Sequence, residues 1–153
     1  MSKIELVPLI NSTKFAIVDK SSYKKAMRLT WYLANSHGAY VLSNKHGFCV
    51  PLHIFLFGKA PDGLEWDHWD TNTLNNTRKN LRQVTRSQNC ANRKMQRNNT
   101  SGYKGVSLYR GKWRALIRFQ GKTISLGYYA NKHDAADAYS RAAKKYFGEY
   151  ARI

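Results

Sequence analysis

An Asp-His pair followed by spaced asparagines is the part of this sequence whose residue types could do chemistry. Asp67 and His68 are adjacent, Asn80 follows His68 by twelve residues, and Asn89 follows it by twenty-one. A neutral imidazole can take a proton from water near pH 7. Carboxylate and amide oxygens are the ligands that a hard divalent cation prefers. Together these groups are the components needed to hydrolyse a phosphodiester bond.

A hairpin followed by a helix could bring these groups together. The pattern predicts a hairpin from about Leu64 through Thr85, after which Ser87 would cap a helix that carries Asn89. If the first strand of the hairpin packs against this helix, Asp67, His68 and Asn89 converge on one space the size of an ion. An isolated Asp-His pair is more often a surface ion pair, so this interpretation depends on the asparagines in register with it.

Residues 61–93 resemble the HNH (ββα-metal) nuclease motif of phage and intron homing endonucleases. The resemblance implies that Asp67 and Asn89 bind one divalent metal ion, Mg²⁺ or Mn²⁺. It implies further that His68 is the general base and that Asn80 orients its ring. The sequence departs from the motif at Trp69, Asn75 and Ile54, where an aliphatic residue, Asp and Arg are usual. Further matching residues lie upstream, at 17–19, 31–32 and 52–53.

Several arginines near the motif are candidates for contact with DNA. Arg78, Arg82 and Arg86 are expected to follow the phosphate backbone. Arg93 lies four residues after Asn89, which would place both on one helical face and bring Arg93 near a phosphate.

Net charge points to the same kind of partner. The chain carries +17 overall, and residues 71–133 contain fourteen Lys or Arg but no Asp or Glu. Solubilising surfaces normally mix both signs, so this stretch predicts binding to a phosphate backbone. No apolar run reaches the roughly 18 residues of a membrane span, and the N-terminus does not resemble a signal peptide. Cys49 and Cys90 have no CxxC partner, which favours reduced thiols and a cytoplasmic location.

The C-terminal third shows the clearest periodicity in the chain. Strands are predicted at 106–109, 112–119 and 122–126, with tight turns at 110–111 and 120–121. In the second strand, Trp113, Ala115, Ile117 and Phe119 alternate with Lys112, Arg114, Leu116 and Arg118. An amphipathic helix is predicted over 131–147, with alanines that allow close packing on the apolar face. The basic face of the sheet would then be open to solvent.

This region resembles the AP2 DNA-binding domain over essentially all of 102–153. The resemblance rests on Gly105-Val106, Trp113-Arg114-Ala115, Ile117-Arg118, Leu126-Gly127, Ala135-Ala136, Ala138-Tyr139 and Gly148-Glu149. It implies a sheet that lies in the major groove of double-stranded DNA. The groove-facing candidates are Lys104, Ser107, Tyr109, Lys112, Arg114, Arg118, Thr123 and Ser125. Leu116, Ser107, Thr123 and Ser125 differ from the residues usual in plant members, so the target sequence cannot be carried over.

The predicted organisation is an α+β chain with two functional parts. Residues 1–95 form the nuclease region with its core motif at 61–93, residues 96–101 a linker, and residues 102–153 the AP2-like domain. Within the first 60 residues we expect strands at 14–19, 39–42 and 48–51, a helical turn leading into a strand over 21–33, and a helix at 52–57.

These observations favour a metal-dependent, site-specific DNA endonuclease of homing type. One active site per chain favours nicking by a monomer, whereas a dimer could break both strands. The main alternative is a non-catalytic, sequence-specific DNA-binding regulator. An RNA-binding protein is a further alternative, but it predicts stacking aromatics on an open sheet face, and here that face is mainly basic and polar.

Overall fold

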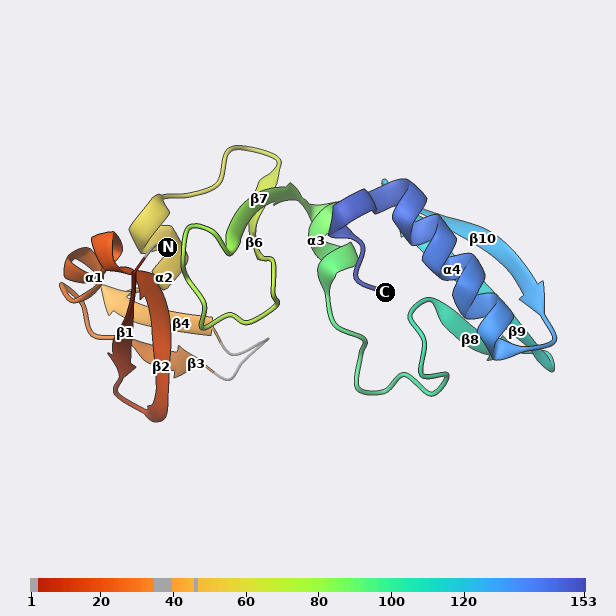
Figure 1. The fold of residues 1–153 in the computed structure, drawn as a ribbon, viewed down its shortest axis with the longest axis horizontal. Helices are drawn as coiled ribbons and strands as arrows, with labels where there is room; N and C mark the ends of the chain where they lie inside the picture. The colour runs from red at the N-terminus through yellow and green to blue at the C-terminus, as the bar shows by residue number, and fades with distance from the viewer. Residues whose placement is uncertain (1–2, 35–39, 46) are drawn as a thin grey trace. The chain divides into compact units, whose positions relative to one another are not determined.

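The protein is a mixed α+β chain with several small antiparallel sheets. The computed structural model describes residues 3–34, 40–45 and 47–153 (Figure 1). The chain divides into two compact units, Met1–Val84 and Thr85–Ile153. In the part of the chain that is described, no helix is both long and apolar enough to cross a membrane.

The N-terminal unit is built from short elements around one apolar core. In chain order these are β1 (Ile4–Leu9), β2 (Ser12–Asp19), α1 (Lys20–Ala26), β3 (Tyr32–Ala34), β4 (Tyr40–Lys45), β5 (Phe48–Pro51), α2 (Leu52–Phe57), β6 (Leu64–His68) and β7 (Leu81–Thr85). Strands β1 and β2 form a hairpin, β3, β4 and β5 form a second sheet, and β6 pairs with β7. Val7, Val18, Trp31 and Leu52 are fully buried in the core.

Most predicted elements of this unit are present. The helix at 52–57 and the strand at 48–51 have the predicted bounds, and the strand predicted at 14–19 lies within β2. Of the strand predicted at 39–42, residue 39 lies outside the described residues. Strand β1 was not predicted, because its sequence does not alternate between polar and apolar residues and contains Pro8.

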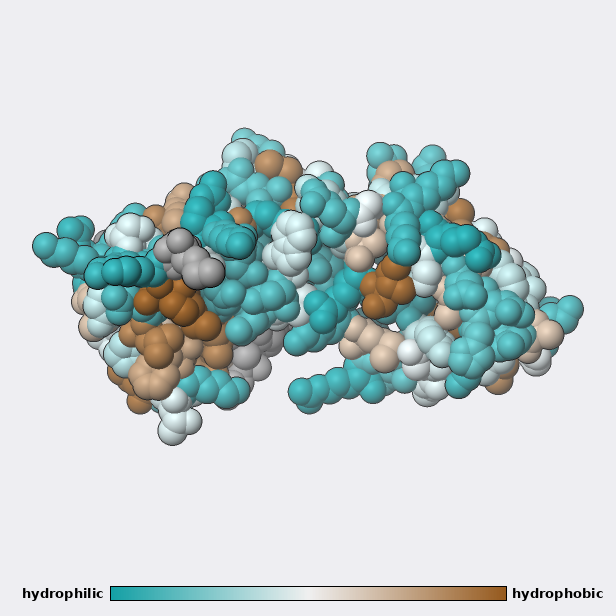
Figure 2. Space-filling view, in the orientation of Figure 1, coloured by the Kyte–Doolittle hydropathy of each residue, from teal (hydrophilic) through white to brown (hydrophobic). Residues whose placement is uncertain are grey.

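The outer face of the β1–β2 hairpin is apolar. Ile4, Leu6 and Phe15 are each about half exposed, and Ile10 at the turn is 73% exposed. Figure 2 shows these strands as a hydrophobic area on the N-terminal unit. The opposite face of β1 carries Val7 and Leu9 into the core, so both faces of this strand are hydrophobic.

The long connection between β6 and β7 is tied to β2. The Ile17 amide donates to the carbonyl of Leu74, and the Asn76 amide donates to the carbonyl of Ile17, each at 2.8 Å. Asn76 is 1% exposed. Backbone hydrogen bonds to a core strand help to offset the entropy that this segment loses when it is ordered. The residues that follow His68 therefore have a defined position within this unit.

Helix α3 (Arg86–Asn92) opens the C-terminal unit. Thr85, not the predicted Ser87, caps it. The Thr85 hydroxyl accepts from the Gln88 amide, and the Gln88 side chain accepts from the Thr85 amide. This reciprocal capping box satisfies two amides that have no partner within the helix. The sequence T-R-S-Q contains this signal and begins two residues before Ser87.

The rest of the C-terminal unit is a three-stranded sheet with one long helix along it (Figure 1). Its elements are β8 (Val106–Tyr109), β9 (Lys112–Phe119), β10 (Lys122–Tyr129), α4 (Lys132–Phe147) and the short 3₁₀ helix η1 (Gly148–Tyr150). Both tight turns lie where predicted, and Arg110, Gly111, Gln120 and Gly121 all have positive φ. That conformation matches two-residue hairpin turns.

Two apolar clusters join α4 to the sheet. One contains Ile117, Ala142, Ala143 and Phe147 and also includes Ala91 of α3. The other contains Val106, Ala115, Ala135 and Ala138. The small alanines allow close approach of helix and sheet, as the sequence predicted.

Residues 96–101, the predicted linker, form no helix or strand. They are nevertheless hydrogen-bonded, because the Asn99 side chain donates to the carbonyl of Tyr103 and the Ser101 hydroxyl lies 3.0 Å from Asn99 Oδ1. Ser101 is 5% exposed. The predicted domain limits of 95 and 102 remain a prediction.

Candidate active site

His68 ends strand β6 and is buried beside Asp67. The two residues are 5% and 6% exposed. The His68 Nε2 atom lies 3.4 Å from the Oδ1 atom of Asn76. An amide oxygen can only accept a hydrogen bond, so this contact favours the tautomer with a proton on Nε2. Nδ1 is then the nitrogen that could accept a proton.

The surroundings of His68 favour its neutral form. Burial lowers the pKa of His68, and the Asn76 contact and the carboxylates of Asp70 and Asp67 offset part of this effect. The His53 ring stands edge-on to His68 with centroids 5.4 Å apart. Burial, and then the charge of His68, lower the pKa of His53 to about 4. An uncharged imidazole can act as a base near neutral pH.

Asp67 forms an ion pair with Arg82 on the facing strand, β7. Its Oδ2 atom is 2.9 Å from Nε of Arg82, and the two side chains are 7% and 14% exposed. The Arg82 guanidinium lies over the Trp69 ring at 4.6 Å. Trp69, the residue that departs from the usual motif, therefore helps to hold the arginine that contacts Asp67. Arg82 was predicted to follow the DNA backbone, and the structure instead places its Nε on the predicted metal ligand.

Asn80 lies close to the site but contacts different groups from those predicted. Its side-chain nitrogen donates to Asp70 Oδ1 at 2.9 Å and to the Asn75 carbonyl at 2.8 Å, while its Oδ1 accepts from the Asp70 amide. Its carbonyl accepts from the Trp69 amide. Asn80 thus closes the turn that follows His68, and Asn76 is the amide within reach of the ring. Any orienting effect of Asn80 on His68 would be indirect.

Asn89 lies on α3 and is partly buried in the C-terminal unit. Among the described residues, no cluster of three or more His, Cys, Asp or Glu could hold a metal ion. Mg²⁺ is commonly bound by one or two protein oxygens together with water and substrate phosphate. The carboxylate of Asp67 and the amide oxygen of Asn89 therefore fit a hard divalent ion in chemical type.

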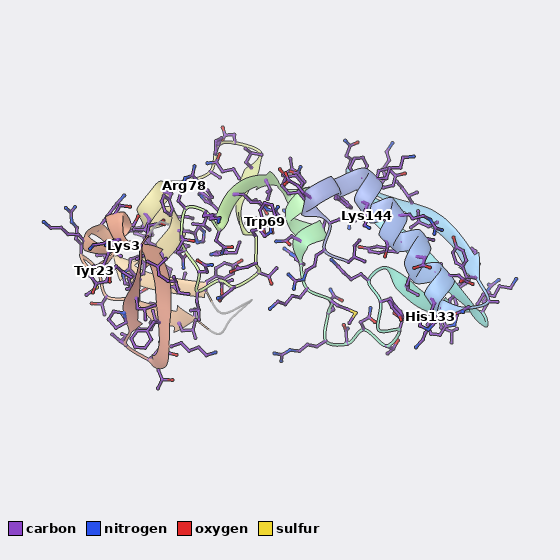
Figure 3. The ribbon with its side chains drawn as sticks, viewed as in Figure 1. Lys3, Tyr23, Trp69, Arg78, His133 and Lys144 are labelled. Carbon is purple, nitrogen blue, oxygen red and sulfur yellow. The ribbon has the colours of Figure 1, made fainter. Side chains whose placement is uncertain are left out.

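The remaining arginines of this region have distinct surroundings. The Arg78 guanidinium lies 5.7 Å from the Phe57 ring centroid and 5.5 Å from that of Trp66 (Figure 3), and its backbone amide donates to Asp19. Arg86 is exposed in the first turn of α3.

Arg93 follows α3 rather than extending it. It is exposed and has ψ of 144°, because the helix ends at Asn92. Arg93 is therefore the residue that caps the helix carrying Asn89, and its contact with a phosphate stays a prediction.

The sheet of the C-terminal unit gathers most of the predicted groove-facing residues on one face. Tyr109 pairs with Lys112, Ser107 with Arg114, Thr123 with Arg118, and Ser125 with Leu116. Residues directly opposite each other on neighbouring strands share a face. Lys112, Arg118, Thr123 and Ser125 are exposed on it, whereas α4 covers the opposite face.

A β-bulge adds an aromatic residue to this face that periodicity did not predict. The register shifts between Ser125 and Gly127, so Tyr128, not Gly127, pairs with Arg114. Tyr128 is 53% exposed and lies 6.0 Å from the Tyr109 ring, over which Arg114 is held at 4.8 Å. The sequence signal was Gly127, since an isolated glycine in a strand often marks a bulge.

Lys104 does not join that face. Its ammonium donates to the carbonyls of Ala91 and Arg152, each at 2.7 Å. Burial, and then the charge of Arg152, lower the pKa of Lys104 to about 8. The amine is engaged within the unit and not displayed with Lys112 and Arg118.

Comparison with known proteins finds matches to an endonuclease family, to a transcription factor and to a phage protein. Residues 54–91 match the family model described as HNH endonuclease. An uncharacterized HNH endonuclease, L560, of Acanthamoeba polyphaga mimivirus is 32% identical over 143 residues, which cover 90% of this chain and 73% of that protein. No solved structure matches significantly.

Two other relatives match only part of the chain. The AP2-like ethylene-responsive transcription factor TOE2 of Arabidopsis thaliana is 44% identical over 59 residues, 37% of this chain and 12% of that protein. Protein 3.8 of Escherichia phage T7 is 39% identical over 67 residues, 42% of this chain and 55% of that protein.

Proposed function

The chain belongs to the HNH endonuclease family, and we propose that it is a metal-dependent, site-specific endonuclease that acts on double-stranded DNA. The observation that carries this proposal is the buried His68, whose surroundings favour its neutral form and which is adjacent to Asp67 within the matched segment. Buried ionisable groups whose pKa is shifted from its ordinary value cluster at functional sites, which supports catalysis over a scaffold.

In the proposed reaction, His68 removes a proton from a water molecule as the water oxygen attacks phosphorus. The bond from phosphorus to the 3′ oxygen breaks, and the 3′ oxyanion takes a proton from solvent, which gives a 5′-phosphate and a 3′-hydroxyl. Bound to Asp67 and Asn89, Mg²⁺ or Mn²⁺ would supply positive charge for the leaving oxygen. Asn76 would hold the His68 ring, and Asn80 would shape the turn beside it. Arg82 would neutralise Asp67 until the cation binds.

The C-terminal unit would grip the duplex. We place its basic face, with Lys112, Arg114 and Arg118, in the major groove in the manner of an AP2 domain, since a two- or three-stranded ribbon fits that groove. Arg78, Arg86 and Arg93 are exposed, lie near the catalytic segment in the sequence and are proposed to contact phosphates. Net charge of +17 supports binding dominated by phosphate contacts.

One active site per chain favours a monomer that nicks one strand. Supercoiled plasmid distinguishes the possibilities. Purified protein is incubated with plasmid and Mg²⁺, Mn²⁺ or EDTA, where Mn²⁺ serves to relax sequence specificity. Relaxed circles that require the metal would support nicking, and linear product would indicate paired cuts. Intact plasmid under Mn²⁺ despite tight duplex binding would overturn the nuclease proposal in favour of a DNA-binding regulator.

A further inference from the structure

The C-terminal end of α3 is capped by residues that are distant from it in the chain. The carbonyl of Ala91 accepts from the Lys104 ammonium at 2.7 Å and from the Arg152 amide at 3.3 Å. The same ammonium donates to the carbonyl of Arg152 at 2.7 Å. The last carbonyls of a helix have no partner within it, and a cation there also interacts favourably with the helix dipole. Lys104 therefore joins α3 to the last residues of the chain, whose end is marked C in Figure 1.

Helix α3 depends on these contacts because it is short. It has seven residues, whereas isolated helices below roughly 12–15 residues are marginal in water. Its buried residues are Ala91 and Asn92, and Ala91 packs in the cluster formed by Ile117, Ala142, Ala143 and Phe147. The capping box fixes only the first turn. The far end of α3 is therefore positioned by the sheet, by α4 and by Lys104.

Asn89 shares this helix with Ala91. At about 100° per residue, the two positions lie about 200° apart around the helix axis. Packing of Ala91 on the sheet and α4 thus turns position 89 to the opposite side of α3. The rotation of α3, and with it the direction of Asn89, is set by what holds Ala91.

We propose that Lys104 is a positioning residue for cleavage, which holds α3 so that Asn89 is placed to bind the divalent ion. The inference rests on the proposed function of Asn89. It differs from the role implied by the AP2 resemblance, in which Lys104 would contact DNA. A lysine loses solvation when it is half-buried, and its two short hydrogen bonds to carbonyls offset that cost.

The test uses the full chain with Lys104→Met and a matched control, Lys144→Met. Lys144 is exposed on α4 (Figure 3) and has no place in the proposed site. A cavity of about 160 Å³ beside Lys104, lined also by Met95 and Tyr139, gives the methionine room. Amide hydrogen exchange of residues 88–92 reports the hold on α3, and titration with Mn²⁺ followed by electron paramagnetic resonance reports the ion site.

Lys104→Met is expected to speed exchange in α3 and to weaken Mn²⁺ binding by about tenfold, the low end for loss of a group that supports a metal ligand. Single-turnover cleavage at saturating DNA should fall by a similar factor, with DNA affinity within about twofold of the Lys144→Met control. Lys104→Arg should restore both, because a guanidinium can also donate to two carbonyls. Removal of residues 152–153, which also deprives Ala91 of partners, should reproduce the effect if Lys104→Met does not fold.

Unchanged exchange and Mn²⁺ affinity in Lys104→Met would overturn the inference. So would a loss confined to DNA affinity, with the salt dependence reduced by about one phosphate contact, since Lys104 would then be an ordinary DNA contact. If wild-type protein neither binds Mn²⁺ nor cuts DNA, the proposed function fails and the positioning role with it. Faster exchange in α3 would then show a purely structural hold.

Discussion

The two units build their proposed sites in opposite ways. In the N-terminal unit, His68 and Asp67 are buried, and each is held by a neighbour that is itself held, such as Arg82 over Trp69. In the C-terminal unit, the basic residues repeat along exposed strands and depend mainly on the register of the sheet. Chemistry at one bond requires fixed atoms, whereas contact with a phosphate backbone requires a charged surface. Single substitutions should therefore cause large losses of stability or cleavage in the first unit and small losses of DNA affinity in the second.

Loss of Arg82 should have the largest effect on folding. Arg82→Met keeps much of the contact with Trp69 but leaves the buried Asp67 carboxylate without this cation. We expect unfolding free energy to fall by about 3 kcal/mol, the lower end of the range for breaking a buried ion pair, because Arg82 is 14% exposed. Urea unfolding measures this, with Arg86→Met as the exposed control. A change below about 1 kcal/mol would mean that the pair behaves as a surface ion pair.

Addition of a divalent ion sharpens this prediction. If Arg82 neutralises Asp67 until the cation binds, Mn²⁺ should recover part of the stability lost in Arg82→Met, because the ion supplies the missing charge. Stability that does not respond to Mn²⁺ in either protein would contradict a metal-binding role for Asp67.

Acid should destabilise the N-terminal unit through its buried histidines. The folded pKa of His53, about 4, lies below the unfolded value of 6.5, so the folded form binds fewer protons. Its contribution is complete above pH 6.5 and is lost as pH falls toward 4. The loss between pH 7.5 and pH 4.5 should be roughly 2–3 kcal/mol, and His68 shifts stability in the same direction. Urea unfolding of wild type and His53→Gln at both pH values isolates the contribution of His53 to the loss of stability. The same loss in both proteins would refute that contribution.

The smallest effect is expected on the open sheet face. Arg118→Ala should weaken duplex binding by up to about tenfold and reduce the slope of log affinity against log salt by about one. Lys122→Ala is the matched control, because Lys122 pairs with Phe119 on the inner register. Equal effects of both substitutions would mean that the charge of the whole unit matters and that the face has no special role.

The accuracy of prediction from the sequence differs between locally specified strands and contacts that depend on tertiary structure. Strands β8 and β9 have the predicted bounds because alternation and glycine turns specify them locally. Strand β10 runs three residues beyond the prediction because the bulge at 125–127 shifts the alternation. The partner of the His68 ring could not be predicted, since Asn76 reaches it through the hydrogen bonds that tie its loop to β2. The hold of Lys104 on Ala91 likewise arises from tertiary packing alone.

The central claim is that His68 is the base, and single-turnover cleavage tests it most directly. Wild type, His68→Ala and the control His133→Ala are compared at saturating DNA with Mg²⁺ or Mn²⁺. General-base catalysis predicts a cleavage rate lower by roughly 10²–10⁴-fold in His68→Ala, with DNA affinity unchanged. Cleavage within a few-fold of wild type, or binding lost together with cleavage, would contradict the account.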